Sequence, residues 1–217
     1  MPIKILLADD HAIVRSGLRA LLEKESDLEI IGEVEDGRKA VEMAIELRPN
    51  VVIMDISMPQ LNGVEATRIL LKEISEVKVI ALSMYTERRF AAEMLAAGAS
   101  GYVLKSEAFA ELVQAIHSVM KGKAFLSPGI AKLVIDDYKL HLSKNESIPP
   151  CPLSHREREV LQLLAEGKST KEMAAVLHIS IKTIDAHRQQ IMGRLGIHSV
   201  AELTKYAIRE GLTSLDT

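Results

Sequence analysis

Short, continuously apolar runs recur along the first half of the chain, and each is followed by a longer segment in which apolar residues return every three or four positions. The runs are rich in Val, Ile and Leu and do not alternate with polar residues, which is typical of parallel strands covered on both faces. The longer segments have the period of amphipathic helices. This alternation occurs five times between Ile3 and about Lys121. We therefore predict an α/β fold with a five-stranded, doubly wound parallel sheet.

The second half of the chain shows no strand pattern after the polar, proline-rich stretch SKNESIPPCP. The segment EMAAVLHISIKTIDAHRQQIMGRL predicts a short helix, a tight connection at residues 178–180 and a longer helix from about Ile181. This spacing is that of a helix-turn-helix. Helix starts are indicated by three Ser-x-x-Glu capping boxes and helix ends by two glycines: Ser154 with Glu157, Ser169 with Glu172, Ser199 with Glu202, and Gly167 and Gly196.

Length and composition support two globular domains, because 217 residues exceed what one modest core usually holds. We predict an α/β domain over residues 1–121, a linker with one helix over 122–150, and a small all-helical domain over 151–217. A single cysteine excludes an intrachain disulfide, and no apolar segment approaches the length that spans a membrane. We therefore expect a cytoplasmic protein. The net charge of −3 argues against a strongly basic nucleic-acid binder but does not exclude DNA binding.

Polar residues follow four of the apolar runs, at the point where each predicted strand ends. They are Asp9 and Asp10 after IKILLA, Asp55 after VVIM, Ser83 after VKVIAL and Lys105 after GYVL. Ligands bind beyond the carboxyl ends of the strands in open parallel sheets, so these side chains are expected to converge in one pocket. Each of them alone has a plainer explanation: Asp10 as a helix cap, Asp55 as a loop residue, Lys105 as a solvated charge. Their joint placement favours a site.

Three ionised carboxylates in one pocket would repel one another unless a cation lay among them, and a hard divalent ion such as Mg²⁺ suits oxygen ligands. One carboxylate could then attack a phosphoryl group in line, since phosphoryl transfer needs chiefly positioning and electrostatic stabilisation. Lys105 would hold a phosphoryl oxygen and Ser83 would donate a hydrogen bond to it. The residues thus indicate a phosphate-accepting, metal-binding site.

The motifs DDHAIVRSGL, MDISMPQLNG, ALSMY and GYVLKS resemble the receiver domain of two-component response regulators, and LSHREREVLQLLAEGKSTKEMAAVLHISIKTIDAHRQQIMGRLGIHS is similar to the LuxR-type helix-turn-helix of the NarL/FixJ subfamily. The resemblance covers nearly all of the chain apart from the linker. It implies that Asp55 is the phosphoacceptor, with Asp10 and Asp55 as direct metal ligands and Asp9 acting through water. It also implies that the carbonyl of Ser57 is a ligand and that Ser83 and Tyr102 are switch residues. An amphipathic residue half buried at a sheet edge is the plainer interpretation of Tyr102.

A helix over residues 181–195 would bury Ile181, Ile184, Ile191 and Leu195 on one stripe. The opposite face carries side chains able to contact base edges, and residues at its margins could hold phosphates. The predicted base-reading residues are Lys182, Asp185, Ala186 and Gln189, and the predicted phosphate contacts are Lys171, Thr183 and Arg188. Periodicity alone would equally suit a solvated helix face. In the last helix, Val200, Leu203, Ala207 and Ile208 or Leu212 recur at helical spacing. They could form core packing or, as the resemblance suggests, a dimer contact.

The leading hypothesis is a DNA-binding response regulator in which a sensor histidine kinase phosphorylates Asp55, which promotes homodimerisation and controls transcription from double-stranded DNA. One alternative is a phosphorylation-independent DNA binder whose receiver-like half serves for dimerisation. The other is an enzyme, a magnesium-dependent phosphatase. It is disfavoured because no glycine-rich phosphate loop follows the first strand. We therefore do not expect enzymatic turnover, and we expect no membrane partner.

Overall fold

The computed structural model describes residues 1–84, 88–132, 134–135 and 153–213. These residues form two compact units, an α/β unit and a helical unit. Each unit has its own hydrophobic core. This agrees with the prediction of two domains, which was made because the chain is longer than one modest core usually holds. Within the described residues, no helix is both long enough and apolar enough to cross a membrane.

The α/β unit alternates strands and helices along the chain. A parallel strand needs a crossover to reach its neighbour, and each amphipathic segment supplies one. The elements are β1 (Ile3–Ala8), α1 (Ala12–Leu22), β2 (Leu28–Val34), α2 (Gly37–Leu47), β3 (Val51–Asp55), α3 (Gly63–Glu73), β4 (Lys78–Ser83), α4 (Arg88–Ala96), β5 (Gly101–Leu104), α5 (Ala108–Met120) and β6 (Phe125–Leu126).

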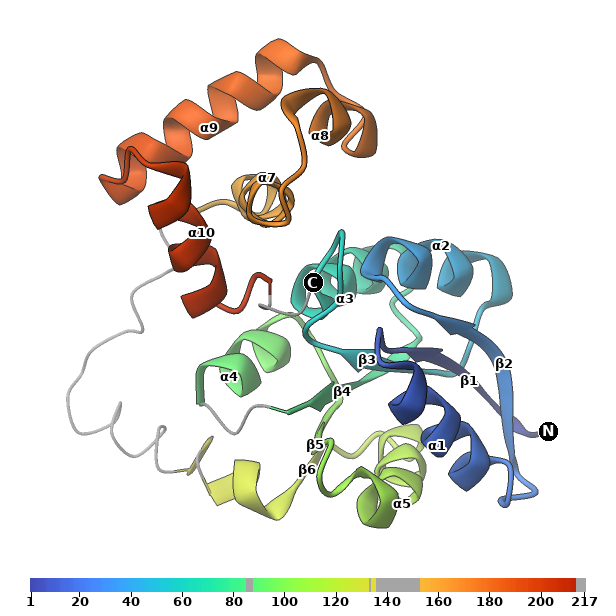
Figure 1. Ribbon diagram of the computed structural model, residues 1–217. Helices are drawn as coiled ribbons and strands as arrows, with labels where there is room; N and C mark the ends of the chain where they lie inside the picture. The colour runs from blue at the N-terminus through green and yellow to red at the C-terminus, as the bar shows by residue number, and fades with distance from the viewer. Residues whose placement is uncertain (85–87, 133, 136–152, 214–217) are drawn as a thin grey trace. The chain divides into compact units, whose positions relative to one another are not determined.

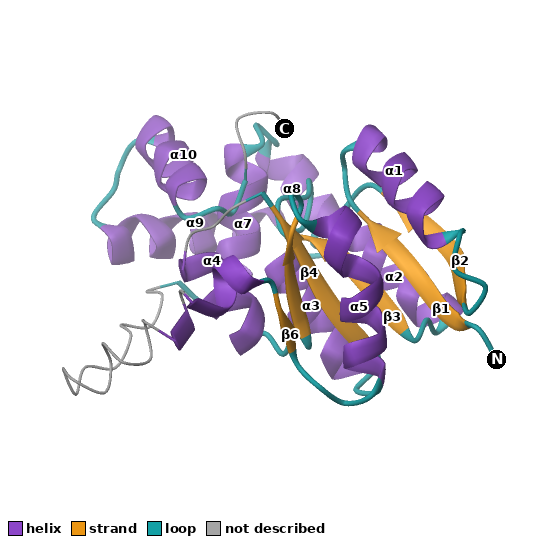
Figure 2. Ribbon diagram, turned by 90° about the horizontal axis from the view of Figure 1, so that it is seen from below, coloured by secondary structure: helices purple, strands orange, loops and turns teal. Residues whose placement is uncertain are grey.

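All strands are parallel, in the order β2-β1-β3-β4-β5-β6. Helices α1 and α5 cover one face of the sheet and α2, α3 and α4 cover the other (Figure 1). Figure 2 shows the strands side by side with α1 and α5 in front of them. From β1 the chain passes to β2 on one side of β1, and then to β3 on its other side. The strand order therefore reverses between β1 and β3. The predicted doubly wound α/β sheet is confirmed.

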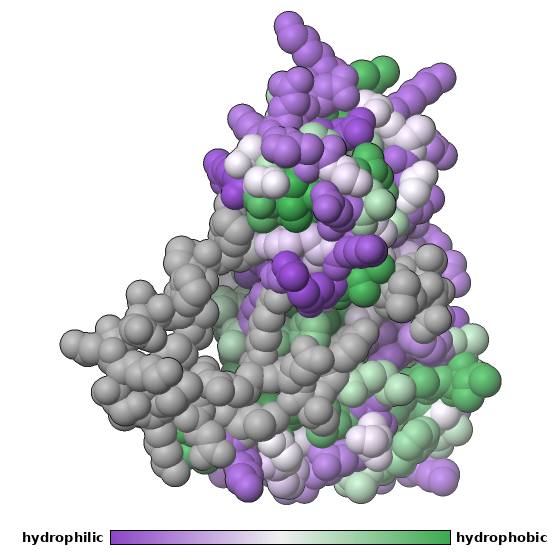
Figure 3. Space-filling view, turned by 60° about the vertical axis from the view of Figure 1, so that its left-hand side comes forward, coloured by the Kyte–Doolittle hydropathy of each residue, from purple (hydrophilic) through white to green (hydrophobic). Residues whose placement is uncertain are grey.

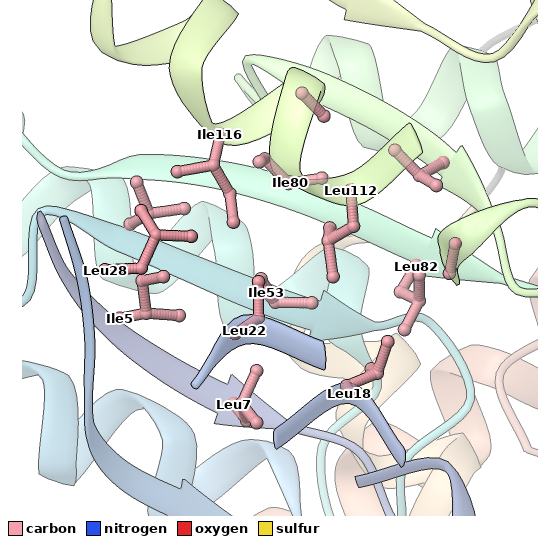
Figure 4. Close-up of a cluster of buried hydrophobic side chains, with 14 of the residues drawn as sticks. Ile5, Leu7, Leu18, Leu22, Leu28, Ile53, Ile80, Leu82, Leu112 and Ile116 are labelled. Carbon is pink, nitrogen blue, oxygen red and sulfur yellow. The ribbon is translucent and has the colours of Figure 1, made fainter. Parts of the chain in front are cut away.

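The core between the sheet and helices α1 and α5 is built from the apolar runs that predicted the strands. Ile5, Ile53 and Ile80 on neighbouring strands meet Leu112 and Ile116 of α5, and all are buried (Figure 4). Their side chains come from both layers and interdigitate, as in any close-packed interior. This packing fixes where the carboxyl ends of β1, β3, β4 and β5 lie.

A sixth strand is present that the sequence did not predict. Its two residues pair in parallel with β5, Phe125 beside Gly101 and Leu126 beside Tyr102. Two residues are too few to show a period, so the pattern alone could not find them. After it, residues 128–132 and 134–135 are helical. Pro128 is the first residue of this helix, a position that suits proline because the N–H it lacks has no partner there.

The helical unit contains α7 (His155–Ala165), α8 (Thr170–Val176), α9 (Ile181–Leu195) and α10 (Val200–Arg209). Two predicted capping boxes are present, at Ser154 and at Ser169, where the serine hydroxyl and the glutamate three residues later satisfy each other's backbone. The third is absent, since the side chain of Ser199 makes no capping hydrogen bond. The stretch SKNESIPPCP and most of the predicted linker lie outside the described residues, and the domain boundaries at 121 and 150 stay predictions.

Candidate functional site

The carboxyl ends of β1 and β3 form the point at which the strand order reverses. Asp9 directly follows β1, and Asp55 is the last residue of β3. Ser83 ends β4 and Lys105 directly follows β5. In open parallel sheets the crevice at such a reversal is where ligands bind. The structure therefore brings the predicted polar residues to the end of the sheet that can hold a ligand.

Lys105 ties two of the carboxylates together. Its Nζ donates a hydrogen bond to Asp55 Oδ2 at 2.7 Å and forms an ion pair with Asp9 Oδ2 at 2.8 Å. All three side chains are almost fully buried, with at most 8% of each residue exposed. Buried charges persist only when they are paired, and this pairing is direct. The alternative that Lys105 is a solvated surface charge is wrong.

Burial dominates the electrostatics of the acceptor candidate. It raises the pKa of the Asp55 carboxyl from 3.8 to about 7, with the neighbouring Asp9 and Asp10 adding to the rise and Lys105 opposing it. Burial would lower the pKa of Lys105, but the attraction of Asp55 and Asp9 outweighs it and the pKa of Lys105 is raised. A cation bound beside Asp55 would therefore stabilise its ionised form and lower its pKa.

Asp10 lies beside the pair and does not cap α1. The N-cap residue of that helix is His11, whose side chain makes no capping bond. The backbone N–H of His11 instead donates to Asp9 Oδ1 at 2.8 Å. Asp10 Oδ1 is a buried oxygen that accepts no hydrogen bond from any described residue. An orphaned acceptor of this kind inside a polar pocket is a candidate metal ligand.

The donor set fits a divalent cation. Ligand atoms of Asp9, Asp10, His11 and Asp55 all lie within 4.8 Å of one another. Three ionised carboxylates and one ammonium group leave two negative charges unbalanced, which one divalent ion would neutralise. Carboxylate oxygens are the ligands that Mg²⁺ prefers. Ser57 is half buried two residues beyond Asp55, and its amide points to Asp55 Oδ1 at 3.4 Å.

Ser83 and Tyr102 are both fully buried. The carbonyl oxygen of Ser83 accepts the backbone N–H of Lys105 at 2.7 Å, and Leu82, directly before Ser83, pairs with Asp55 across the sheet. Tyr102 lies in β5, between β4 and β6. The alternative that Tyr102 is a half-buried residue at a sheet edge is wrong, because β6 covers that edge.

Two functional neighbours were missed by the sequence reasoning. His11 contributes a ring nitrogen to the acidic cluster, and Gly63 lies against the backbone of the acceptor candidate. A histidine directly after the aspartate pair was the available signal for the first. The second stands in the Asn-Gly pair that opens α3, where Asn62 accepts the N–H of Glu65 at 3.0 Å. Glycine directly after a helix cap is a signal of close backbone approach.

The helix-turn-helix of the second unit is made by α8 and α9. The connection turns at His178, whose φ is 52°, and Ser180 caps α9 by accepting the N–H of Thr183 at 3.1 Å. Ile184 and Ile191 are buried as predicted, and Leu195 packs partly against the same core. The prediction that Ile181 is a core residue is wrong, since it is 50% exposed. It is rotated by about 60° from Ile184 around the helix, at the margin of the buried stripe.

The predicted DNA-contacting residues lie on the solvent side of this helix pair. Those on the surface are Lys171, Lys182, Thr183, Asp185, Ala186 and Gln189. Arg188 is half buried, and its guanidinium lies 3.9 Å from Asp185 and donates to Thr170 at 3.4 Å. In the space-filling view, most visible atoms of the helical unit belong to hydrophilic residues (Figure 3). Six of these side chains are therefore accessible to a ligand, whereas Arg188 is held by its contacts with Asp185 and Thr170.

Helix α10 is mainly a core element. Leu203 and Ala207 of α10, and Leu212 just beyond its end, are buried in the same cluster as residues of α7 and α9, so core packing is confirmed for them. Val200 is 44% exposed and takes no part in that core.

Comparison with known families matches both units. Residues 5–117 match the response regulator receiver domain, and residues 151–207 match the bacterial regulatory proteins of the luxR family. The two models occur in the order that the sequence motifs predicted.

Individual proteins match along almost the whole chain. The transcriptional regulatory protein LiaR of Bacillus subtilis is 38% identical over 98% of this chain and 100% of its own. The response regulator UvrY of Escherichia coli is 37% identical over 99% of this chain and 98% of its own. RcsB of Salmonella enterica serovar Typhimurium, solved bound to promoter P1flhDC in the presence of a phosphomimetic, matches with a TM-score of 0.62 and 29% identity, over 98% of this chain and 100% of its own. The protein belongs to the two-component response regulators of the NarL/FixJ type, DNA-binding regulators of transcription in which a receiver domain precedes a LuxR-type helix-turn-helix.

Proposed function

We propose that a sensor histidine kinase phosphorylates Asp55 and that this modification promotes homodimerisation and binding to double-stranded DNA. The observation that carries the proposal is the hydrogen bond from Lys105 Nζ to Asp55 Oδ2 at 2.7 Å beside a second buried carboxylate, Asp9. A buried aspartate that is paired with a lysine at the ligand-binding end of a parallel sheet is suited to carry a phosphoryl group.

Asp55 acts as the nucleophile. One of its carboxylate oxygens forms the new bond to phosphorus while the bond from phosphorus to the donor breaks and the donor leaves with that electron pair. Asp10 and Asp55 would hold Mg²⁺ directly, Asp9 through water and Ser57 through its carbonyl oxygen. When bound, the ion would neutralise charge on the phosphoryl oxygens. Lys105 binds a phosphoryl oxygen, for which its ammonium group moves only from Asp55 Oδ2 to an oxygen of the phosphoryl group that Asp55 then carries.

Ser83 and Tyr102 transmit the structural effect of phosphorylation from Asp55 to the neighbouring strands. The hydroxyl of Ser83 donates to the phosphoryl group, and the displacement at the end of β4 reaches Tyr102 on β5, its neighbour in the sheet. A modification that adds nearly two negative charges biases a two-state equilibrium only through contacts that differ between the states. Tyr102 is fully buried. An outward rotation of its ring would expose it, so its contacts can differ between the two states.

Ser127 links that strand to the residues that leave the domain. Its N–H donates to the carbonyl of Tyr102 at 2.9 Å, and its hydroxyl accepts from Leu104 N–H at 3.3 Å and donates to Glu111 at 2.5 Å. Its own carbonyl accepts the N–H groups of Ile130 and Ala131 in the first turn of the following helix. A shift of β5 would therefore pull on the start of the segment that joins the two domains.

In the DNA-binding domain we propose that α9 enters the major groove. Lys182, Asp185, Ala186 and Gln189 would read base edges, because a cation, an acceptor, a methyl group and an amide each match a different edge. A further set would hold phosphates and fix the register: Lys171, Thr183 and Arg188. Two copies on adjacent half-sites would bind together, which is why dimerisation raises affinity. The protein would act in the cytoplasm as a regulator and not as an enzyme on small molecules.

The intact mass of the full-length protein after incubation with acetyl phosphate and Mg²⁺ tests the acceptor. One added phosphoryl group is expected, and Asp55→Asn should abolish it. Asp36→Asn is the matched control, since Asp36 is an equally buried carboxylate that caps α2 and should leave labelling intact. Labelling that persists in Asp55→Asn would reject the acceptor assignment.

The same preparations test the switch. Donor should increase both the dimer fraction in multi-angle light scattering and the affinity in a band-shift assay, in the wild type and in Asp36→Asn but not in Asp55→Asn. A DNA affinity that does not respond to donor, although Asp55 is labelled, would favour phosphorylation-independent binding. Turnover of a phosphate monoester would contradict the non-enzymatic role.

A further inference from the structure

The imidazole of His11 lies among the carboxylates of the site although the residue is exposed enough to turn away. Its side chain is 53% exposed. Even so, Nδ1 lies 2.7 Å from Asp10 Oδ1, 3.4 Å from Asp9 Oδ1 and 3.9 Å from Asp55 Oδ2. One ring nitrogen thus faces an oxygen of each carboxylate in the cluster.

The shortest of these approaches has the distance of an ion pair when the imidazole is protonated, but it does not have the geometry of a hydrogen bond. Asp10 Oδ1 is buried and accepts no hydrogen bond from the described residues, even though Nδ1 is so near. Two ligand atoms bound at neighbouring positions of one octahedral ion lie about 3 Å apart when each bond is about 2.1 Å. The pair Nδ1 and Oδ1 has nearly that separation and lacks the alignment that a shared proton would impose.

We propose that His11 Nδ1 is an additional ligand of the metal ion bound by Asp10 and Asp55, and that it makes this site prefer Mn²⁺ and later first-row divalent ions over Mg²⁺. The inference rests on the proposed function, because it needs the metal site described there. It adds a nitrogen ligand to a set otherwise made of oxygen.

The preference follows from the chemistry of the ligand. Imidazole suits transition metals and zinc, and at a site containing nitrogen the affinity rises from Mn²⁺ toward Cu²⁺. Mg²⁺ prefers oxygen ligands and keeps several waters, so it gains little from a ring nitrogen. His11 binds as the neutral imidazole with its proton on Nε2, which leaves the Nδ1 lone pair for the metal. Its position as N-cap of α1 brings the ring to the site without a change in the helix.

Pulsed electron paramagnetic resonance of full-length protein loaded with Mn²⁺ tests the ligand directly. The wild type is expected to show modulation from a coordinated ¹⁴N, and His11→Gln should lose it. His198→Gln is the matched control, since His198 is an exposed histidine of the other domain and its replacement should leave the signal unchanged. The Mn²⁺ dissociation constant should rise about tenfold in His11→Gln, while that of Mg²⁺ should stay within about twofold, because oxygen ligands dominate its binding.

The outcomes separate the two proposals. Mn²⁺ bound to wild type without ¹⁴N modulation, or with modulation that His11→Gln retains, would overturn the role of His11 while the oxygen site of the proposed function stands. Mn²⁺ affinity that is unaffected by the double substitution Asp10→Asn and Asp55→Asn would instead show that the metal binds elsewhere. That result would reject the metal site itself.

Discussion

The α-carbon of Gly63 faces the backbone of Asp55 so closely that a Cβ atom at Gly63 would lie 2.0 Å from the carbonyl oxygen of Asp55. The N–H of Gly63 also donates to the carbonyl of Ile56 at 2.8 Å. The start of α3 is thus pressed against the turn that follows the acceptor candidate. Only a residue without a side chain permits that approach.

Gly63→Ala should therefore destabilise the receiver domain by about 2 kcal/mol or more, since the obstacle is backbone and cannot rotate aside. Gly129→Ala is the control in the same compact α/β unit, because its Cβ would meet Leu104 at an ordinary contact distance of 3.7 Å. Urea unfolding followed by circular dichroism measures both. Equal unfolding midpoints for the two variants would show that the turn after Asp55 yields more easily than its geometry indicates.

Divalent metal should stabilise the receiver domain through the acidic cluster. An ion that binds only the folded state at one hundred times its dissociation constant adds about 2.7 kcal/mol. The thermal midpoint of the receiver transition should therefore rise with Mg²⁺ in the wild type and in Asp36→Asn. Asp10→Asn, which removes the negative charge of a carboxylate in the cluster, should lose most of the rise. Potassium chloride at matched ionic strength is the control for screening, and a rise that Asp10→Asn retains would count against the cluster.

The convergence of Asp9, Asp55 and Lys105 at one edge of the sheet could be predicted from sequence because it follows from topology: the carboxyl ends of parallel strands lie at the same edge. The direct contacts also need the long side chain of Lys105, which reaches from the end of β5 past β4 to Asp55 on β3. The place of His11 could not be predicted in this way, since its ring reaches the carboxylates only through its own side-chain torsions and the exact start of α1. The closeness of Gly63 to Asp55 likewise depends on the path of the turn between β3 and α3.

In the DNA-binding domain the apolar period of about 3.6 residues predicted the helices. It was less accurate for residues at the edge of the buried stripe. Ile184 and Ile191 were placed correctly because they lie near the centre of the buried stripe, whereas Ile181 lies at its edge in the first turn. The Ser-x-x-Glu pattern was right at Ser154 and Ser169 and wrong at Ser199, because the pattern specifies residue types but not the side-chain rotamer that closes the box.

Removing a cap should cost stability only where the capping bond exists. The Ser154 hydroxyl donates to Glu157 Oε2 at 2.6 Å and accepts the N–H of Glu157. Ser154→Ala should therefore lower the free energy of unfolding of the DNA-binding domain by about 1 kcal/mol. Ser199→Ala should change it by no more than a few tenths, because Ser199 makes no such bond. Chemical denaturation of the full chain, fitted to the transition of this domain, compares the two. Equal losses would contradict the observed capping pattern.

Glu157 should make the DNA-binding domain sensitive to acid. Burial would raise the pKa of its carboxyl, but the hydrogen bonds from Ser154 and the nearby Arg194 and His187 outweigh burial and leave the pKa below its usual 4.5. A depressed folded-state pKa means that the stabilisation is complete above about pH 4.5, the unfolded value, and is lost as the pH falls through the folded value. Glu157→Gln should flatten this dependence, and Glu202→Gln, at the capping box that does not form, should not. Identical acid profiles for the wild type and Glu157→Gln would contradict the prediction.

Lys182 and Gln189 lie on the same exposed face of α9, and substitution of each should affect DNA binding in a different way. A cation at a phosphate or guanine contributes through counterion release, so Lys182→Ala should weaken binding and reduce the slope of log affinity against log salt by about 1 if it contacts phosphate. An amide that reads a base edge contributes sequence discrimination, so Gln189→Ala should relax the preference at one position by about 1 to 3 kcal/mol and leave the salt slope unchanged. Lys4→Ala, at the start of β1 in the receiver domain, makes the same charge change on a residue outside α9 and is the control. Binding measured by fluorescence anisotropy over a salt series, with a panel of single-base variants, distinguishes these effects. If Lys182→Ala and Lys4→Ala bind DNA with the same affinity and the same salt slope, α9 is not part of the DNA interface.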